Sequence, residues 1–78
     1  MSYVYVVSLS EEYCDSFEVL CVANSIETAL PCVVATFGRY GIPETELKFT
    51  KHPWGFQYTG VDQYLDEVYV RLERHEML

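Results

Sequence analysis

The sequence predicts a single α+β domain over residues 1–78, in which a small, mainly antiparallel sheet carries one helix on a face in the order β-β-α-β-β-β. Three observations predict it: short runs of β-branched and aromatic residues, one long stretch with helical spacing, and a length of 78 residues. Half of the residues (50%) are hydrophobic, which excludes a disordered chain, and the length leaves room for one core only.

The first two strands are expected at residues 3–9 and 17–23, where β-branched and aromatic side chains predominate. The polar residues 10–16 between them predict a connecting loop, so the two strands form a hairpin with an acidic tip. Both strands carry apolar residues on both faces. We therefore expect part of this sheet to be covered on both sides.

A helix is expected over residues 26–40, where apolar side chains recur at intervals of three and four. Asn24 is expected at the N-cap with Glu27 at N3, as in a capping box, and Gly41 fits the left-handed position after the last turn. Pro31 lies inside this stretch. The sequence leaves two alternatives: a kinked helix, or a separate first turn with Pro31 opening the main helix.

Two further strands are expected at residues 47–50 and 56–59, joined by the turn-like residues 51–55. The C-terminal element is ambiguous. Residues 61–76 contain a helical stripe of apolar side chains, whereas residues 67–73 alternate between apolar and polar. The β-branched and aromatic residues at the centre of this segment favour a strand.

Charge restricts the partners. Twelve Asp and Glu residues against five Lys and Arg residues give a net charge of −7, and no lysine or arginine precedes Arg39. Such a chain repels phosphate backbones and anionic membranes, so we expect no direct nucleic-acid binding and no membrane association. No basic stretch precedes an apolar one near the N-terminus, so we expect no signal peptide. Together with the odd number of cysteines, three, this favours reduced thiols in a cytoplasm.

The sequence favours a protein that is not an enzyme. Structural zinc sites use closely spaced ligand pairs, and the five candidate ligands are too far apart in sequence for that: Cys14, Cys21, Cys32, His52 and His75. The acidic residues around Cys14 disfavour a reactive thiolate, and no glycine-rich phosphate loop occurs. We expect no catalytic residue, no metal and no cofactor.

One candidate binding feature is aromatic. Trp54, Phe56 and Tyr58 occupy alternating positions, so we expect the three rings to point the same way and to anchor a partner protein. The alternative is that these rings belong to the core.

A second candidate is the outer face of the expected helix, where Pro31, Val34 and Ala35 lie in a stretch without any charged side chain. A helix that is apolar all round is normally covered on both sides, so a partner protein or a second copy in a homodimer is expected there. The alternative is that C-terminal residues fold over it.

The third candidate is the acidic hairpin tip, formed by Glu11, Glu12, Asp15 and Glu18. These charges are expected to steer the protein toward a basic patch on a partner.

Several segments resemble small acidic accessory proteins of bacteriophages: the Tyr/Val-rich opening strand, Ser-Glu-Glu-Tyr at residues 10–13, Ser-Ile-Glu-Thr-Ala at residues 25–29 and Glu-Val-Tyr-Val-Arg-Leu-Glu at residues 67–73. This resemblance implies a role directed at a host enzyme such as a protease, a polymerase or a defence nuclease, in the host cytoplasm if the protein is phage-encoded.

The leading hypothesis is therefore a non-enzymatic protein-binding module that inhibits or redirects a host enzyme. One alternative is a DNA mimic that blocks a DNA-binding protein, which needs a contiguous acidic face. The other is a small enzyme, which needs a pocket that joins Cys14 to His52 or His75.

Overall fold

A computed structural model of the protein describes residues 2–11 and 18–77. The elements are β1 (Ser2–Glu11), β2 (Glu18–Ala23), α1 (Ile26–Arg39), the 3₁₀ turn η1 (Glu44–Glu46), β3 (Lys48–His52), β4 (Gly55–Val61) and β5 (Glu67–Met77). This confirms the α+β class and the order β-β-α-β-β-β. It also decides the ambiguous C-terminal segment, which is a strand.

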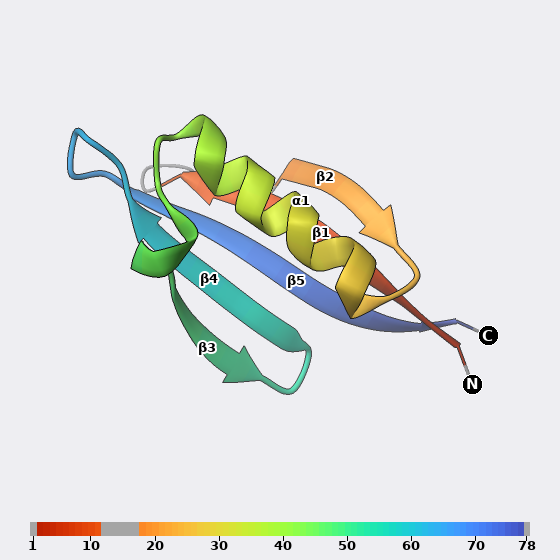
Figure 1. Cartoon of the computed structure of the whole chain (residues 1–78). Helices are drawn as coiled ribbons and strands as arrows, with labels where there is room; N and C mark the ends of the chain where they lie inside the picture. The colour runs from red at the N-terminus through yellow and green to blue at the C-terminus, as the bar shows by residue number, and fades with distance from the viewer. Residues whose placement is uncertain (1, 12–17, 78) are drawn as a thin grey trace.

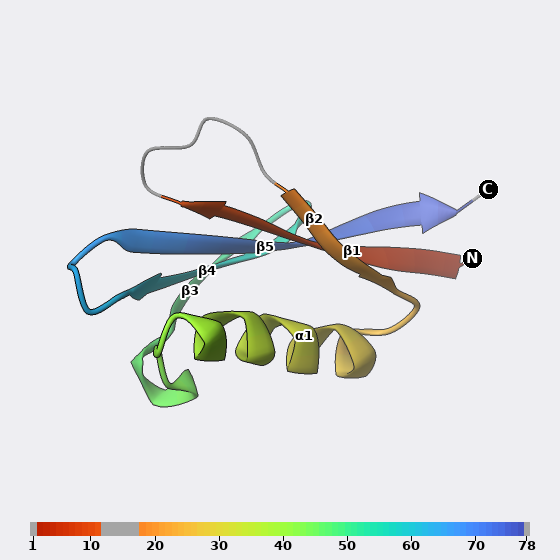
Figure 2. The same ribbon diagram turned by 90° about the horizontal axis from the view of Figure 1, so that it is seen from above.

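The five strands form one antiparallel sheet in the order β2-β1-β5-β4-β3. The N-terminal and C-terminal strands are therefore neighbours at the centre of the sheet, and β2 and β3 are its two edges (Figure 1). Helix α1 lies on one face, where it packs over β2, β1 and β5 (Figure 2). In the part of the chain that the structure describes, no helix lies on the opposite face.

The core lies between α1 and the centre of the sheet. Phe37, at the C-terminal end of α1, has no exposed surface, and Val7 of β1 and Leu72 of β5 are paired in register beneath the helix. The buried apolar residues are Val7, Ala23, Ala29, Val33, Phe37, Ile42, Val68, Val70 and Leu72. Alternation along β1 and β5 places Val7, Val68, Val70 and Leu72 on the helix-bearing face.

The helix begins one residue later than the capping-box pattern predicts. Ser25, with an extended backbone, is the N-cap, and its hydroxyl accepts a hydrogen bond from the Thr28 N–H at 3.2 Å. Asn24 therefore does not cap the helix. Pro31 lies inside one continuous helix, and the carbonyl that loses its usual donor belongs to Glu27. Both residues are on the exposed side of α1, where water can satisfy that carbonyl.

The end of α1 follows the sequence prediction. Gly41 has a φ of +73°, and its N–H bonds the Gly38 carbonyl at 3.1 Å. The Ile42 N–H reaches back to the Phe37 carbonyl at 3.0 Å. These two bonds form a Schellman motif, in which the buried Ile42 and Phe37 provide the accompanying apolar contact.

Candidate binding groove

The helix-bearing face of the sheet is only partly covered. The β3–β4 hairpin extends beyond α1 (Figure 1). Three rings gather on its helix side. The Phe49 ring lies 6.0 Å from that of Phe56 and 5.9 Å from that of Tyr58, and the Phe56 and Tyr58 rings are 6.4 Å apart. We call Phe49, Phe56 and Tyr58 the ring cluster. Phe49 is 63% exposed and lies outside the buried core, whereas Tyr58 is half-buried and packs against it.

A groove of about 290 Å³ separates α1 from this hairpin. It is lined by Leu30, Val33, Val34, Glu44, Leu47, Phe49 and Tyr58. All but Glu44 are apolar or aromatic, and Leu30 on the helix side is 37% exposed. Desolvation by burial raises the pKa of the Tyr58 phenol above its ordinary value, so its hydroxyl stays neutral at physiological pH. This groove can accept an apolar side chain from a partner.

The register of the hairpin explains how the groove arises. Phe49 pairs with Tyr58, and Lys51 pairs with Phe56. The next pair, His52 with Gly55, leaves a connection of only two residues. Phe49 is the main groove residue that the sequence reasoning missed. A hairpin with residues 53–54 as its two-residue connection would have predicted this position, because that register places Phe49 opposite Tyr58.

Trp54 corrects the expectation that three alternating rings point the same way. Its ring stacks on His52 at 4.6 Å, and the Arg71 guanidinium carbon lies 5.2 Å from the ring centroid. Arg71 neighbours the buried Leu72 and so lies on the face opposite α1. Alternation fails because Trp54 is in the turn before Gly55, whose φ is +143°. Phe56 is in register with Leu72 and stays on the helix side.

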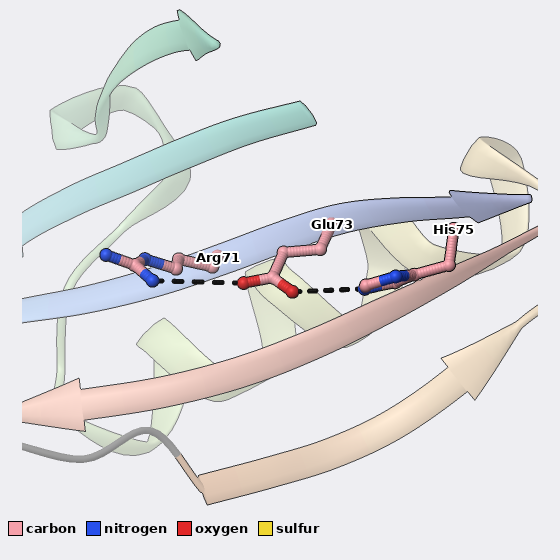
Figure 3. Close-up of polar contacts among 3 residues, drawn as sticks. All are labelled: Arg71, Glu73 and His75. Atoms are coloured by element: carbon pink, nitrogen blue, oxygen red, sulfur yellow. Dashed lines mark hydrogen bonds and ion pairs between the residues drawn. The ribbon is translucent and has the colours of Figure 1, made fainter. Parts of the chain in front are cut away.

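The face opposite α1 carries a row of paired charges. Arg71 Nη1 lies 3.8 Å from Glu73 Oε1, and Glu73 Oε2 lies 3.1 Å from His75 Nε2. Figure 3 shows the three side chains in line along β5. All three side chains come from β5 and project from one face because they are two residues apart. The charges of Arg71 and Glu73 already compensate each other, and Glu73 is also within hydrogen-bonding distance of His75, so this row offers less to a partner than the apolar groove does.

The helix residues expected at an interface separate into two places. Pro31 and Ala35 are exposed on the outward side of α1, whereas the half-buried Val34 lines the groove. The outward side carries mostly small side chains, so it exposes little apolar area. The large exposed apolar side chains of α1 are Ile26 and Leu30, and Leu30 lies at the rim of the groove.

The acidic hairpin tip is described only in part. Glu12 and Asp15 lie outside the described residues, and Glu11 is described only as the last residue of β1. Glu18, the first residue of β2, is exposed. The β2 edge and the β3 hairpin lie at opposite edges of the sheet, so Glu18 is remote from the ring cluster.

A second hollow of about 290 Å³ lies between the end of α1 and the loop that joins β4 to β5. It is lined by Arg39, Tyr40, Gly41, Asp62, Gln63 and Tyr64. Asp62 Oδ1 already accepts hydrogen bonds from the Tyr64 N–H at 2.8 Å and the Asp66 N–H at 3.0 Å. This carboxylate holds the loop together.

Within residues 2–11 and 18–77, no three His, Cys, Asp or Glu side chains are grouped as they are around a metal ion. In the described part of the chain, no helix is both long enough and apolar enough to cross a membrane.

No protein-family model, curated protein or solved structure matches this chain.

Cys21 of β2 and Cys32 of α1 are half-buried free thiols packed against the core. Burial raises the pKa of the Cys21 thiol from 9.0 to about 11, with smaller contributions from a hydrogen bond and charge repulsion involving Cys32. The folded state therefore holds this proton more tightly than the unfolded chain does. The resulting stabilisation is present below pH 9 and is lost as the pH rises toward 11.

We predict that Cys21 reacts slowly with iodoacetamide at pH 8, where only about one thiol in a thousand is ionised. The rate should keep rising up to about pH 11, as followed by mass spectrometry of the peptide that contains Cys21. Burial is the main cause of the raised pKa, and Cys32→Ala removes the smaller contributions of Cys32, so it should speed the reaction at pH 8 modestly. A rate that levels off near pH 9 would contradict the prediction.

Proposed function

We propose that the protein is a non-enzymatic protein-binding module that inhibits or redirects a larger enzyme, with the groove between α1 and the β3–β4 hairpin as its contact surface. The observation that carries the proposal is the exposure of Phe49 beside this groove, at 63% of its surface. Exposed aromatic side chains next to an apolar hollow are typical of protein-binding hot spots. Inhibition of a host enzyme, as for phage accessory proteins, is the role that the sequence resemblance implies.

Charge supports a protein partner. The net charge of −7 speeds encounter with a basic surface and repels nucleic acid. The described acids do not form one face: Glu18 is on β2, Glu27 on α1, and Glu44 on η1. A DNA mimic needs its carboxylates side by side, so the protein-binding hypothesis is better supported than mimicry.

The experiment introduces a photo-crosslinking amino acid at Phe49 in one variant and at Val22 in another. Val22 is a matched control because it is 62% exposed on β2, away from the groove. We expect Phe49, but not Val22, to crosslink to a larger protein in the cells that express the gene. Crosslinking alone is not sufficient. The purified partner's activity must also change when the unmodified protein is added in stoichiometric amount.

Phe49→Ala should then weaken that effect by about 30-fold, the loss expected for a hot-spot side chain worth about 2 kcal/mol. Val22→Ala should change it by less than about twofold, within the range for a residue outside the contact. Equal effects of the two substitutions would contradict the groove as the contact surface. Release of the partner by duplex DNA would favour the DNA mimic instead.

A further inference from the structure

The edge strand β3 is open to pairing. Among the described residues it forms a ladder with β4 on one side only, and its first four residues, 48–51, are exposed. Alternate backbone N–H and C=O groups of an edge strand point away from the sheet, where they can pair with another chain. The opposite edge, β2, is less suited to this because its pairing with β1 shifts between Val7 and Ser8, and such irregularities twist an edge away. The β3–β4 register runs without interruption.

The groove lies on the helix-bearing face of the sheet. A strand added beside β3 would lie about 4.8 Å from it and would place every second side chain on this same face. Phe49 is exposed on that face and borders the groove, together with Leu47. An apolar side chain of the added strand therefore packs against Phe49, while the strand's backbone pairs with β3.

Charge indicates which strand can be added. Lys48 and Lys51 are two of the five basic residues of the chain, and both are exposed on β3. Pairing β3 with the β3 of a second copy would bring four lysines onto one short ladder, between two molecules that each carry −7. An acidic strand complements these two lysines locally, while the overall charge of −7 still attracts a basic surface elsewhere on the same partner. Charge complementarity therefore favours a foreign acidic segment over a second copy of this chain.

We infer that the partner docks by adding an extended, acidic segment with alternating apolar residues as a sixth strand along β3, with an apolar side chain against Phe49. This inference rests on the proposed function and names the chemistry of its partner. Main-chain hydrogen bonds to β3 supply affinity in this mode. The groove selects apolar side chains on the helix-bearing face, and Lys48 selects acidic side chains on the opposite face.

The probe is a capped heptapeptide with phenylalanine at its centre, valine two positions to either side, and glutamate at the four remaining positions. Titration into ¹⁵N-labelled protein should shift the amide signals of β3 and of groove residues such as Leu30 and Val34. The same peptide with lysine in place of glutamate should bind about tenfold more weakly, because like charges then face β3. Lys48→Gln should weaken the acidic peptide several-fold. Arg39→Gln is the control of equal charge change, because Arg39 is at the end of α1, and it should have little effect.

Two N-methylated peptides test the pairing itself. Methylating every second amide in one phase blocks the N–H groups that face β3 and should weaken binding by at least about tenfold. Methylating the other phase blocks only outward N–H groups and should leave binding within about twofold. Equal effects of the two phases, shifts confined to β2, no shifts at about 1 mM peptide, or preference for the lysine peptide would overturn the inference.

Failure of this inference can be distinguished from failure of the proposed function. If Phe49→Ala weakens inhibition of the crosslinked enzyme while the two methylation phases behave alike, the groove binds a partner but not as an added strand. If Phe49→Ala leaves inhibition unchanged, the proposed function itself fails. A concentration-dependent dimer that the acidic peptide does not dissociate would assign β3 to a second copy and would overturn the inference as well.

Discussion

Replacing Phe37 with alanine is expected to destabilise the protein by about 3–5 kcal/mol. Phe37 has no exposed surface and lies at the end of α1, where it packs with the other core residues and with Ile42 of the helix cap. The substitution removes a whole ring from this core and leaves a cavity that rigid neighbours cannot fill. A domain of this size has a free energy of unfolding near the low end of about 5–15 kcal/mol, so the loss takes most of it.

The measurement is chemical denaturation followed by far-UV circular dichroism. Phe49→Ala is the matched control, because it removes the same ring from a site that is 63% exposed, and it should cost less than about 1 kcal/mol. If Phe37→Ala does not fold at all, Phe37→Leu gives a smaller, measurable loss of about 1–1.5 kcal/mol. Equal losses at the two phenylalanines would contradict the placement of the core.

The comparison of Phe37→Ala with Phe49→Ala also tests whether Phe49 serves binding or folding. A phenylalanine that contributes little to stability and remains exposed is better explained by binding than by folding. Phe37 and Phe49 are both aromatic residues in regular elements, and composition alone does not separate them. Their different surroundings come from the position of α1, which covers the centre of the sheet and leaves the β3–β4 hairpin free.

Local signals in the sequence were sufficient for the elements themselves. The end of α1 was predictable because glycine at residue 41 adopts a left-handed conformation at little cost and Ile42 follows it. The strand at the C-terminus was predictable from its β-branched and aromatic residues. The N-cap was misplaced by one residue, because Asn24 and Ser25 are both good N-caps and only the fold decides between them.

Features that depend on the arrangement of elements were not predictable. Alternation correctly places Phe56 and Tyr58 on one face, but it fails at Trp54, because the hairpin turn breaks the period. The groove requires knowledge of which strands α1 covers, and that choice follows from the sheet order, in which β1 and β5 meet at the centre. Sequence periodicity carries no information on that pairing.

The hairpin that carries Phe49 depends on one glycine, and Gly55→Ala should destabilise the protein by more than about 3 kcal/mol. A Cβ atom at this position would lie 2.0 Å from the Leu72 carbonyl oxygen, which is a backbone atom of the central strand β5 and cannot rotate away. In addition, the φ of +143° is one that residues with a side chain rarely adopt. The two costs add, because relieving the contact requires β4 and β5 to separate.

Gly38→Ala and Gly60→Ala provide the graded comparison. A Cβ at Gly38 meets nothing within 4 Å, and alanine in a helix should stabilise the protein by about 0.5–1 kcal/mol. A Cβ at Gly60 would lie 2.9 Å from an Ile42 side-chain atom, which can shift, so a loss of about 1–2 kcal/mol is expected. In thermal unfolding, Gly38→Ala should have the highest melting temperature of the three variants, Gly60→Ala the next, and Gly55→Ala the lowest. If Gly55→Ala unfolds no earlier than Gly60→Ala, then β4 does not approach β5 as closely as the structure places it, and the position of Phe49 beside the groove loses its support.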